Sequence, residues 1–552
     1  MTPMTDMMRR MMLVAGMMWS VAVSEASPVL DFVYPAGGQP GSDFEIEVGG
    51  SSLEGATLAA VSGENVAATF LGPARTMAKN KNGQLVPVNI PGRLRYKVVI
   101  GKDAVPGMRA FRVSTPHRLS EPVGFEVLPM PELSEPVTNR AGTAIHDVAG
   151  MPVCLNGRVH GAGGDRYRFQ GTKGMTVVAF TEAGTLPPGA FLPALAFTDA
   201  DGKPCDGVTI HEPASAPVAV FEVPQDGMYA LEVKAASGTV GDACVYRVKL
   251  GEFPLVTALS PAGAQEGENL NVRLAGVNLP QKRIRLFTGG KNSALCLQTL
   301  TEGAYALPSL RFGLAAETSA PDFSVTMTPA SLNIPANGSA LVTLRARRLN
   351  GFGGEIRVGL DFPPLSIASE GGVIPAGEDT CRMTVSTDGI RFPRVIFGLA
   401  LTATAEIGGQ AVKRAVVPVR DDTSGDGGRP QTFTELFARS NAGLDALRLD
   451  VPPKGKITVS EKQPANLFVL SPSLSPHLGG SHVPVVVYPE SGFTVEAMQR
   501  TNKQERAEIL LRVDPNVLKA GSTGQLILGC VKKDAPKQTF TAVTQSVPFV
   551  VK

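Results

Sequence analysis

Glycine and proline interrupt this sequence at short intervals along its whole length. There are 60 glycines and 44 prolines among 552 residues. Both disfavour helix interiors, proline because it lacks an N–H group and clashes with the preceding turn, and glycine because ordering its backbone costs entropy. A helical bundle or a coiled coil is therefore excluded. Since 43% of the residues are apolar, the chain can still bury a core. We predict an all-β protein built of β-sandwich modules in series.

The first 26 residues have the organisation of a secretory signal peptide. Arg9 and Arg10 precede an uncharged apolar run, Met11 to Ala22, and small residues then lead to a cleavage site before Ser27. The run is too short to span a bilayer, which takes about 20 residues. We expect an exported protein without a transmembrane segment, located in the periplasm, at the cell surface or outside the cell.

An internal repeat relates residues 34–53 to residues 260–279 at a fixed offset of 226 positions. Seven residues are identical in the two copies: Pro35, Ala36, Gly37, Gln39, Gly41, Gly50 and Leu53 recur as Pro261, Ala262, Gly263, Gln265, Gly267, Gly276 and Leu279. Between the glycines, apolar residues alternate with polar ones in both copies. This alternation predicts a strand with one buried face, entered and left through glycine turns.

The same pattern resembles the IPT/TIG type of immunoglobulin-like domain, which opens with a Pro-Gly turn, an alternating strand and a Gly-x-x-Leu or Gly-x-x-Phe ending. The resemblance assigns residues 27–128 and 253–320 to two such domains. Domains of this type are sandwiches used as spacers or binding platforms, so the resemblance implies a role without catalysis.

A different module separates the two copies, at residues 129–252. Turn signals such as Asp201-Gly202 separate seven segments that we predict to be its strands: 154–159, 166–170, 175–181, 195–197, 218–223, 228–233 and 244–250. The module resembles the bacterial pre-peptidase C-terminal domain in the order of six segments: 152–157, 165–169, 173–174, 199–202, 224–229 and 245–248. Members of that family are jelly-roll β-sandwiches found beside secreted proteases and on surface proteins of the planctomycete type.

The remaining chain is assigned to two further immunoglobulin-like modules, at residues 321–420 and 432–552. A polar, glycine-rich linker at residues 421–431 separates them. One short helix is predicted near residues 432–442. Thr432 and Glu435 have the spacing of a capping box there, and three apolar residues share one helical face: Phe433, Leu436 and Phe437.

The sequence contains no recognisable catalytic motif. A serine hydrolase of the nucleophile-elbow type needs Gly-x-Ser-x-Gly, and no such elbow is present. Three cysteines, Cys296, Cys381 and Cys530, fall singly into different modules, so we expect buried free thiols. The other three share one module and permit at most one disulfide: Cys154, Cys205 and Cys244. We expect a protein that is not an enzyme and needs no cofactor, calcium being the one exception considered.

The calcium candidate is a turn with three carboxylates. Asp199, Asp201 and Asp206 bracket a glycine, which is how a loop gathers hard oxygen ligands for this ion. Asp-Gly is also a common β-turn sequence. A calcium loop and a plain turn therefore both fit the residues.

A second candidate is a basic stripe in the first module. Arg93, Arg95 and Lys97 alternate along one predicted strand, so all three side chains point to the same face. One interpretation is a solvated outer face, and the other is docking onto an anionic surface such as a polysaccharide of the cell envelope or lipid head groups. Nucleic acid is not an expected partner, because export separates the chain from it.

We expect a secreted or surface-located protein that binds and spaces partners without catalysis. Its expected partners are anionic cell-envelope or extracellular polysaccharide, or other surface proteins. Two alternatives stay open: an accessory chain of a secreted protease system, implied by the pre-peptidase resemblance, and a carbohydrate-binding protein.

Overall fold

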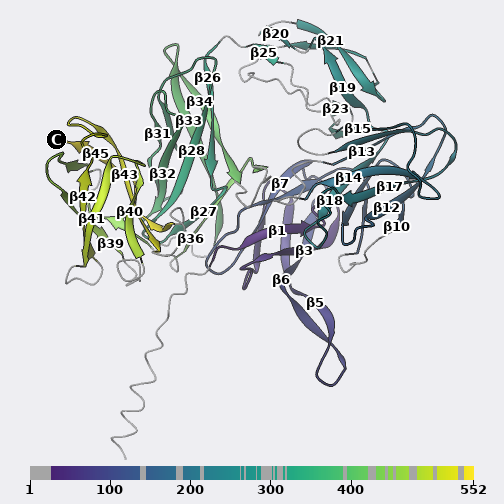
Figure 1. Cartoon of the computed structure of the whole chain (residues 1–552), viewed down its shortest axis with the longest axis horizontal. Helices are drawn as coiled ribbons and strands as arrows, with labels where there is room; N and C mark the ends of the chain where they lie inside the picture. Colours follow the sequence, from purple (N-terminus) through teal and green to yellow (C-terminus); the bar gives the residue numbers. More distant parts are fainter. Residues whose placement is uncertain are drawn as a thin grey trace, which may run out of the picture.

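The computed structural model describes residues 26–136, 145–181, 191–211, 217–261, 263–265, 269–280, 282–287, 301–302, 305–306, 315–317, 320–388, 395–420, 431–441, 446–451, 455–471, 482–500, 506–532 and 540–552. Every regular element in these ranges is a β-strand, which confirms the all-β prediction (Figure 1). No helix of the described residues is long and apolar enough to cross a membrane. Residues 1–25, with the signal segment up to Glu25, lie outside the described residues.

The first unit, residues 26–128, is a sandwich of two four-stranded sheets. One sheet has the order β1-β3-β6-β5, with β1 at Val29–Tyr34, β3 at Asp43–Ser51, β6 at Leu85–Ile100 and β5 at Val66–Lys79. The other has the order β2-β8-β7-β4, with β2 at Gly37–Gly38, β8 at Val123–Val127, β7 at Gly107–Ser114 and β4 at Leu58–Val61. The alternating apolar residues of the repeat point inward, and Ile46 and Val48 are fully buried. β5 and β6 are much longer than the others and extend beyond the sandwich as a two-stranded ribbon (Figure 1).

The second unit, residues 129–252, also has two sheets around one core. The larger has the order β15-β16-β13-β18-β11-β9: Val208–His211, Val218–Glu222, Thr176–Thr181, Val245–Gly251, Val153–Arg158 and Glu132–Ser134. The smaller has the order β10-β12-β17-β14: Ile145–Asp147, Asp165–Gly171, Gly227–Ala235 and Pro193–Asp199. The seven strands expected from the sequence agree with β11, β12, β13, β14, β16, β17 and β18 to within one or two residues at most ends.

The third unit repeats the start of the first in its strand pairing. β1 pairs with β3 from Val29↔Ser51 onward, with an irregularity after Leu30. β19 (Leu255–Ser260) pairs with β21 (Asn269–Val277) in the same register shifted by 226 positions, with the irregularity after Val256. The remaining described strands are β20 (Gly263–Gln265), β22 (Arg283–Phe287), β23 (Thr301–Glu302), β24 (Tyr305–Ala306) and β25 (Ala315–Glu317). The sequence repeat is therefore also a repeat of strand register.

The fourth and fifth units share one composite sheet of sixteen strands, joined by the pair Ser339↔Val543. The fourth unit contributes β26 (Asp322–Thr328), β27 (Ser331–Pro335), β28 (Ser339–Leu349), β29 (Ile356–Asp361), β30 (Ile367–Gly371), β31 (Val373–Ile374), β32 (Thr380–Thr387), β33 (Ile396–Ile407), β34 (Gln410–Arg420), β35 (Gln431–Thr432) and β36 (Leu436–Asn441). The fifth contains β37 (Arg448–Leu449), β38 (Ile457–Val459), β39 (Ala465–Leu470), β40 (His482–Tyr488), β41 (Phe493–Arg500), β42 (Arg506–Val513), β43 (Thr523–Lys532), β44 (Phe540–Val543) and β45 (Val547–Val551). Each of the two units has its own apolar core.

The helix predicted near residues 432–442 is wrong, since β36 occupies this segment. β36 pairs with β27 in parallel and with β33 in antiparallel orientation, and its Leu436 and Ala438 pack into the core of the fourth unit. Apolar residues three and four apart fit a helical face, but pairing with two distant strands outweighs that local preference. Packing therefore places this segment with the fourth unit and not with the C-terminal one.

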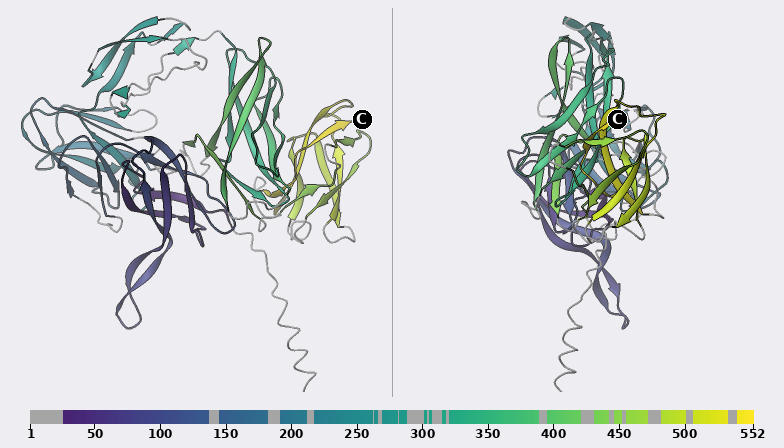
Figure 2. Two further views of the ribbon diagram at one scale, coloured as in Figure 1. Left: turned by 180° about the vertical axis from the view of Figure 1, so that it is seen from behind. Right: turned by 90° about the vertical axis from the view of Figure 1, so that its left-hand side faces the viewer.

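The units do not make contact simply in chain order. The first unit packs against the second and also against the fourth, which follows it by about 200 residues (Figures 1 and 2). The third unit packs on the second, where Leu255 shares an apolar cluster with Phe180. The first unit thus contacts both the second and the fourth unit.

Candidate binding surfaces

The predicted basic stripe lies on β6, opposite an acidic stripe on β3. The two strands are paired with Glu45 beside Lys97 and Glu47 beside Arg95. Arg95 forms an ion pair with Glu45, and Lys97 Nζ lies 2.8 Å from Asp43 Oδ2. The hydrogen bond and charge attraction within the Lys97–Asp43 pair lower the pKa of Asp43 and raise that of Lys97.

Arg93, the third residue of the stripe, faces the second unit. Its Nη2 lies 2.9 Å from Asp242 Oδ2, and its guanidinium carbon lies 4.4 Å from the ring centroid of Phe32. The stripe therefore does project from one sheet face, with Tyr96 and Val98 buried on the other. Each of its three cations has a carboxylate partner within the chain, which reduces the attraction that the stripe offers to an external anion. The acidic alternation at Asp43, Glu45 and Glu47 was visible in the sequence, but its register against β6 was not.

The three aspartates of the calcium candidate lie around the turn after β14. Asp199 Oδ1 accepts hydrogen bonds from the backbone N–H groups of Asp201 (3.0 Å) and Lys203 (2.9 Å). This is an Asx turn, in which the carboxylate holds its own loop. Among the residues that the structure describes, no group of three His, Cys, Asp or Glu side chains is placed to hold a metal ion. The hydrogen bonds thus explain Asp199 without a cation.

Among the described residues, an extensive set of polar contacts joins the first and fourth units. Arg112 on β7 is fully buried and donates from Nε to Ser331 Oγ (2.7 Å) and from Nη2 to Ala330 O (3.0 Å) and Glu435 O (3.2 Å). Its guanidinium carbon lies 4.8 Å from the ring centroid of Phe437. Burial lowers the pKa of Arg112 to about 10, although nearby carboxylates oppose this shift. At neutral pH the arginine stays charged.

Further contacts lie on either side of Arg112. Glu121 of the first unit accepts the backbone N–H groups of Ala330 (2.9 Å) and Ser331 (2.8 Å) through its two carboxylate oxygens. Arg439 on β36 is buried and donates to Ser114 Oγ, to Thr115 O and, over 2.7 Å, to Pro116 O. Arginine suits such a joint because its planar fork can donate several hydrogen bonds at once.

The joint between the first and second units uses a second set of buried charges. Glu126 on β8 accepts hydrogen bonds from Lys249 Nζ (2.7 Å) and Arg247 Nε (3.2 Å) on β18. Burial alone would raise the pKa of Glu126, but Lys249 and Arg247 outweigh it and hold the pKa below its ordinary value. Arg158 Nη1 donates to Glu47 Oε1 over 3.1 Å, and its guanidinium lies over the ring of Tyr34.

Sequence reasoning missed these joints, although one signal was present. Arg112 follows Ala110 and Phe111 and precedes Val113, and Arg247 likewise stands inside an apolar run. An arginine that interrupts apolar residues on a strand is a sign that the outer face of that strand is covered. In β7 and β18 both faces are buried over most of the strand.

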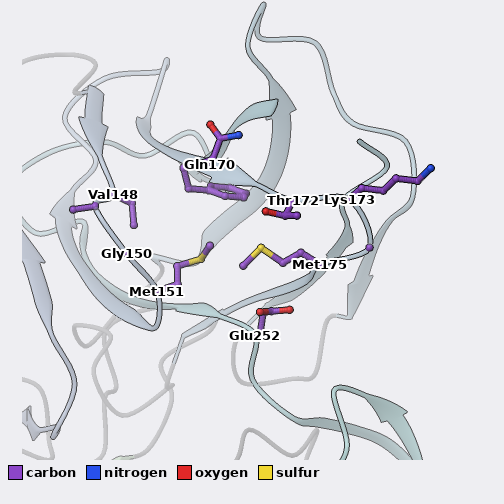
Figure 3. Close-up of a pocket in the computed structure, with 11 residues that line it drawn as sticks. Val148, Gly150, Met151, Gln170, Thr172, Lys173, Met175 and Glu252 are labelled. Atoms are coloured by element: carbon purple, nitrogen blue, oxygen red, sulfur yellow. The ribbon is translucent and has the colours of Figure 1, made fainter. Parts of the chain in front are cut away.

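A pocket of about 530 Å³ lies on the second unit, and none of the joint residues named above lines it (Figure 3). The thioether side chains of Met151 and Met175 lie inside it, and Gln170, Lys173 and Glu252 lie around them (Figure 3). None of the six predicted site residues lines it.

The tyrosines of the second unit belong to its core. Tyr167 and Tyr246 are fully buried, and their hydroxyl oxygens lie 2.8 Å apart. Tyr229 is also buried, and its hydroxyl donates to Gln225 O over 2.9 Å. Stacking on a sugar needs an exposed aromatic face. These three rings do not offer one.

Five cysteines lie within the described residues, and all five are free thiols. Burial raises the pKa of Cys154, Cys381 and Cys530 to about 12. The thiolate is the reactive form of cysteine, so these three are structural. Cys296 lies outside the described residues.

No family model and no curated protein matches this chain. A solved structure that it does match is that of a protein of unknown function from Porphyromonas gingivalis W83. The sequence identity is 12%, the match covers 41% of this chain and 99% of that one, and the TM-score is 0.14. At that TM-score the match carries no argument about fold or function.

Proposed function

We propose that this chain is an exported, non-catalytic protein that binds and spaces partners at a surface, and that its β-sandwich units form a rigid frame. The observation that supports this proposal best is the joint around Arg112. A flexible string of modules has no need to bury charged side chains between units that are 200 residues apart in the chain. A rigid frame does need such buried contacts, because they keep its binding surfaces at fixed positions.

The energetics of the joints support the same proposal. A buried charge is costly unless hydrogen bonds satisfy it, and removing one partner of a buried pair costs about 3–5 kcal/mol. Arg112 and Arg247 are each held by several hydrogen bonds, the first to the fourth unit and the second to Glu126 and Glu132. Separating the units would expose or strand these groups, so each joint resists bending.

The buried titratable groups of the second unit also support a role without catalysis. Burial raises the pKa of the Cys154 thiol and of the Tyr167 hydroxyl, which disfavours the ionised forms that a nucleophile would need. Their partners and positions are those of core residues. This supports a structural role for the second unit, the one that resembles the pre-peptidase C-terminal domain.

Small-angle X-ray scattering of the protein in solution tests the frame. We expect the profile of one rigid particle, and we expect the double variant Arg112→Leu/Arg439→Leu to increase the radius of gyration by freeing the fourth unit from the first. The matched control is Arg95→Gln/Lys97→Gln, two exposed charges whose loss should leave the profile unchanged. If the unmodified protein scatters as a flexible chain with the same dimensions as the double variant, the frame is refuted. Hydrolysis of peptide, ester or glycoside substrates that one point mutation abolishes would refute the absence of catalysis.

A further inference from the structure

The ribbon formed by β5 and β6 carries a surface that the frame does not use. Its outer part, residues 75–89, is here called the distal ribbon. Within it Arg75 pairs with Asn89, and Lys79 with Leu85. An irregularity between Pro73 and Arg75 separates it from the sandwich. In all the views of Figures 1 and 2 it extends away from the rest of the molecule.

Apolar side chains of the distal ribbon are exposed on both of its faces. Cross-strand partners share a face, so Met77, Lys79 and Leu85 point to one side, and Val88 points to the other. Met77 is 57% exposed, Leu85 61% and Val88 44%. A two-stranded ribbon has no second layer to cover such groups, and alone it is only marginally stable in water. Exposed apolar groups clustered in this way mark an interaction site.

The charge of the distal ribbon has one sign. It contains Arg75, Lys79 and Lys81, and no Asp or Glu occurs between Glu64 and Asp103. Arg75 Nε donates to Asn89 Oδ1 over 3.2 Å, and within the described part of the chain none of the three cations has a carboxylate within ion-pair distance. The distal ribbon is therefore a cationic surface whose charges are not neutralised within the described residues, whereas the three cations of the stripe on β6 are each paired with a carboxylate.

The edge of β6 in the distal ribbon is blocked against a further strand. Asn80 donates its backbone N–H to Gln84 O at the end of the ribbon. Because hydrogen-bonded and non-hydrogen-bonded pairs alternate, the pair Met77↔Pro87 is non-hydrogen-bonded, and the nitrogen of Pro87 faces the open edge. Proline has no N–H group to give to an added strand. This disfavours a second copy of the chain or a partner sheet as the occupant of that edge.

We propose that the distal ribbon docks into the surface of an anionic lipid bilayer, with Arg75, Lys79 and Lys81 at the phosphates and Met77, Leu85 and Val88 among the upper acyl carbons. A bilayer surface surrounds a projecting element on all sides, which accounts for apolar groups on both faces. Insertion is shallow, about 5–10 Å, because the open strand edges must stay hydrated. This inference rests on the proposed function as a surface protein and names its partner.

Vesicle co-sedimentation tests the charge and apolar contributions. The protein from Ser27 onward is mixed with vesicles of phosphatidylcholine, with or without phosphatidylglycerol. Each cation contributes about fivefold to binding at an anionic surface, so changing all three to Gln should weaken binding about a hundredfold. The variant Met77→Ser/Leu85→Ser/Val88→Ser should also lose binding, and Arg95→Gln/Lys97→Gln should bind like the unmodified protein. Equal binding of all variants overturns the proposal.

A tryptophan reporter tests the depth. The only tryptophan, Trp19, precedes Ser27, so Leu85→Trp introduces a single fluorophore at the ribbon tip. Its emission should shift to shorter wavelength on anionic vesicles and be quenched by brominated lipid, whereas Val99→Trp, on the exposed face of the same strand nearer the sandwich, should do neither. The opposing result combines two observations: vesicles leave the emission of the Leu85→Trp variant unchanged, and the charge variant loses binding to an acidic polysaccharide. The partner would then be a soluble polyanion, and the lipid proposal would be wrong. Dimerisation lost in the apolar variant would overturn it in favour of a second copy. The scattering test of the frame is independent of both results.

Discussion

The guanidinium of Arg112 donates a hydrogen bond of 2.7 Å from Nε to the hydroxyl oxygen of Ser331, which lies 219 positions further along the chain. The same guanidinium reaches the carbonyl oxygens of Ala330 and Glu435. One side chain of the first unit therefore satisfies three acceptors of the fourth. The planar, forked shape of the guanidinium is as important for this joint as its positive charge.

We predict that Arg112→Lys weakens the joint although it keeps the charge. An ammonium group cannot reproduce the planar fork, and each lost hydrogen bond to a charged group costs about 1.5–3 kcal/mol. A protein of several domains need not unfold in a single two-state transition, so hydrogen exchange, which reports on each strand, is the suitable measurement. Peptides that cover β7 and β27 should exchange faster in the variant, and those of the fifth unit should not. Unchanged protection at β27 would contradict the assignment.

A pH dependence is expected at the other joint. The pKa of Glu126 is below its ordinary value in the folded protein because Lys249 and Arg247 outweigh the effect of burial. The folded state therefore binds this proton less readily than the unfolded state. The stabilisation is complete above about pH 4.5, the unfolded value, and is lost as the pH falls through the folded value. Thermal unfolding between pH 7 and pH 3 should show this loss.

The variant Glu126→Gln isolates that contribution. At pH 7 it should be less stable, because the buried cations Lys249 and Arg247 both lose the negative charge of Glu126. The difference in unfolding temperature between the two proteins should shrink as the pH falls below about 4.5, because the unfolded state of the unmodified protein then binds a proton at Glu126, and it should vanish once the folded carboxyl is protonated too. A difference that stays constant down to pH 3 would show that Glu126 does not titrate in this range.

The cysteines should differ in reactivity. Cys205 is only half-buried, and its thiol is the most accessible of the five described. We predict that iodoacetamide at pH 8 modifies Cys205 first, and that Cys154, Cys381 and Cys530 react only after unfolding, because burial holds their pKa at about 12. Mass spectrometry of peptides gives the order. Early labelling of Cys154 would indicate that the second unit opens locally.

Strands with one buried face were predictable from the sequence, because an alternation of two residues leaves a direct trace. The strand that contains Tyr167 and Phe169 is of this kind, whereas in the strand of Ile46 and Val48 the second unit also covers Glu47 on the outer face. The joints were not predictable, because they depend on which distant strands pair and on which faces meet. Phe433 illustrates this: its spacing from Leu436 and Phe437 fits a helix, yet it packs with Ala110 of the first unit. The acidic partners of Arg95 and Lys97 could not be predicted for the same reason, because the register between β3 and β6 cannot be read from the sequence.

The repeated glycine at positions 50 and 276 has a specific structural reason. A β-carbon on Gly50 would lie 1.9 Å from the carbonyl oxygen of Val29, and one on Gly276 would lie 1.9 Å from that of Leu255. Both carbonyls belong to the strand that pairs with the glycine, beside the same irregularity in the ladder. The sequence repeat therefore preserves a close approach of two backbones.

We predict that Gly50→Ala destabilises the first unit by about 3 kcal/mol or more. This is the upper end of the range of about 1–3 kcal/mol that is typical of overpacking, because the backbone itself has to move. Gly359→Ala on β29 is the matched control, since a β-carbon there meets no atom within 4 Å. Hydrogen exchange should show lost protection in β1 and β3 for the first variant and none for the second. Because β1 carries Tyr34, which donates a hydrogen bond to the carbonyl oxygen of Glu135, the damage should extend to the start of the second unit. Full protection of β1 in Gly50→Ala would mean that the strand can shift past the new methyl group, and the repeated glycine would then need another explanation.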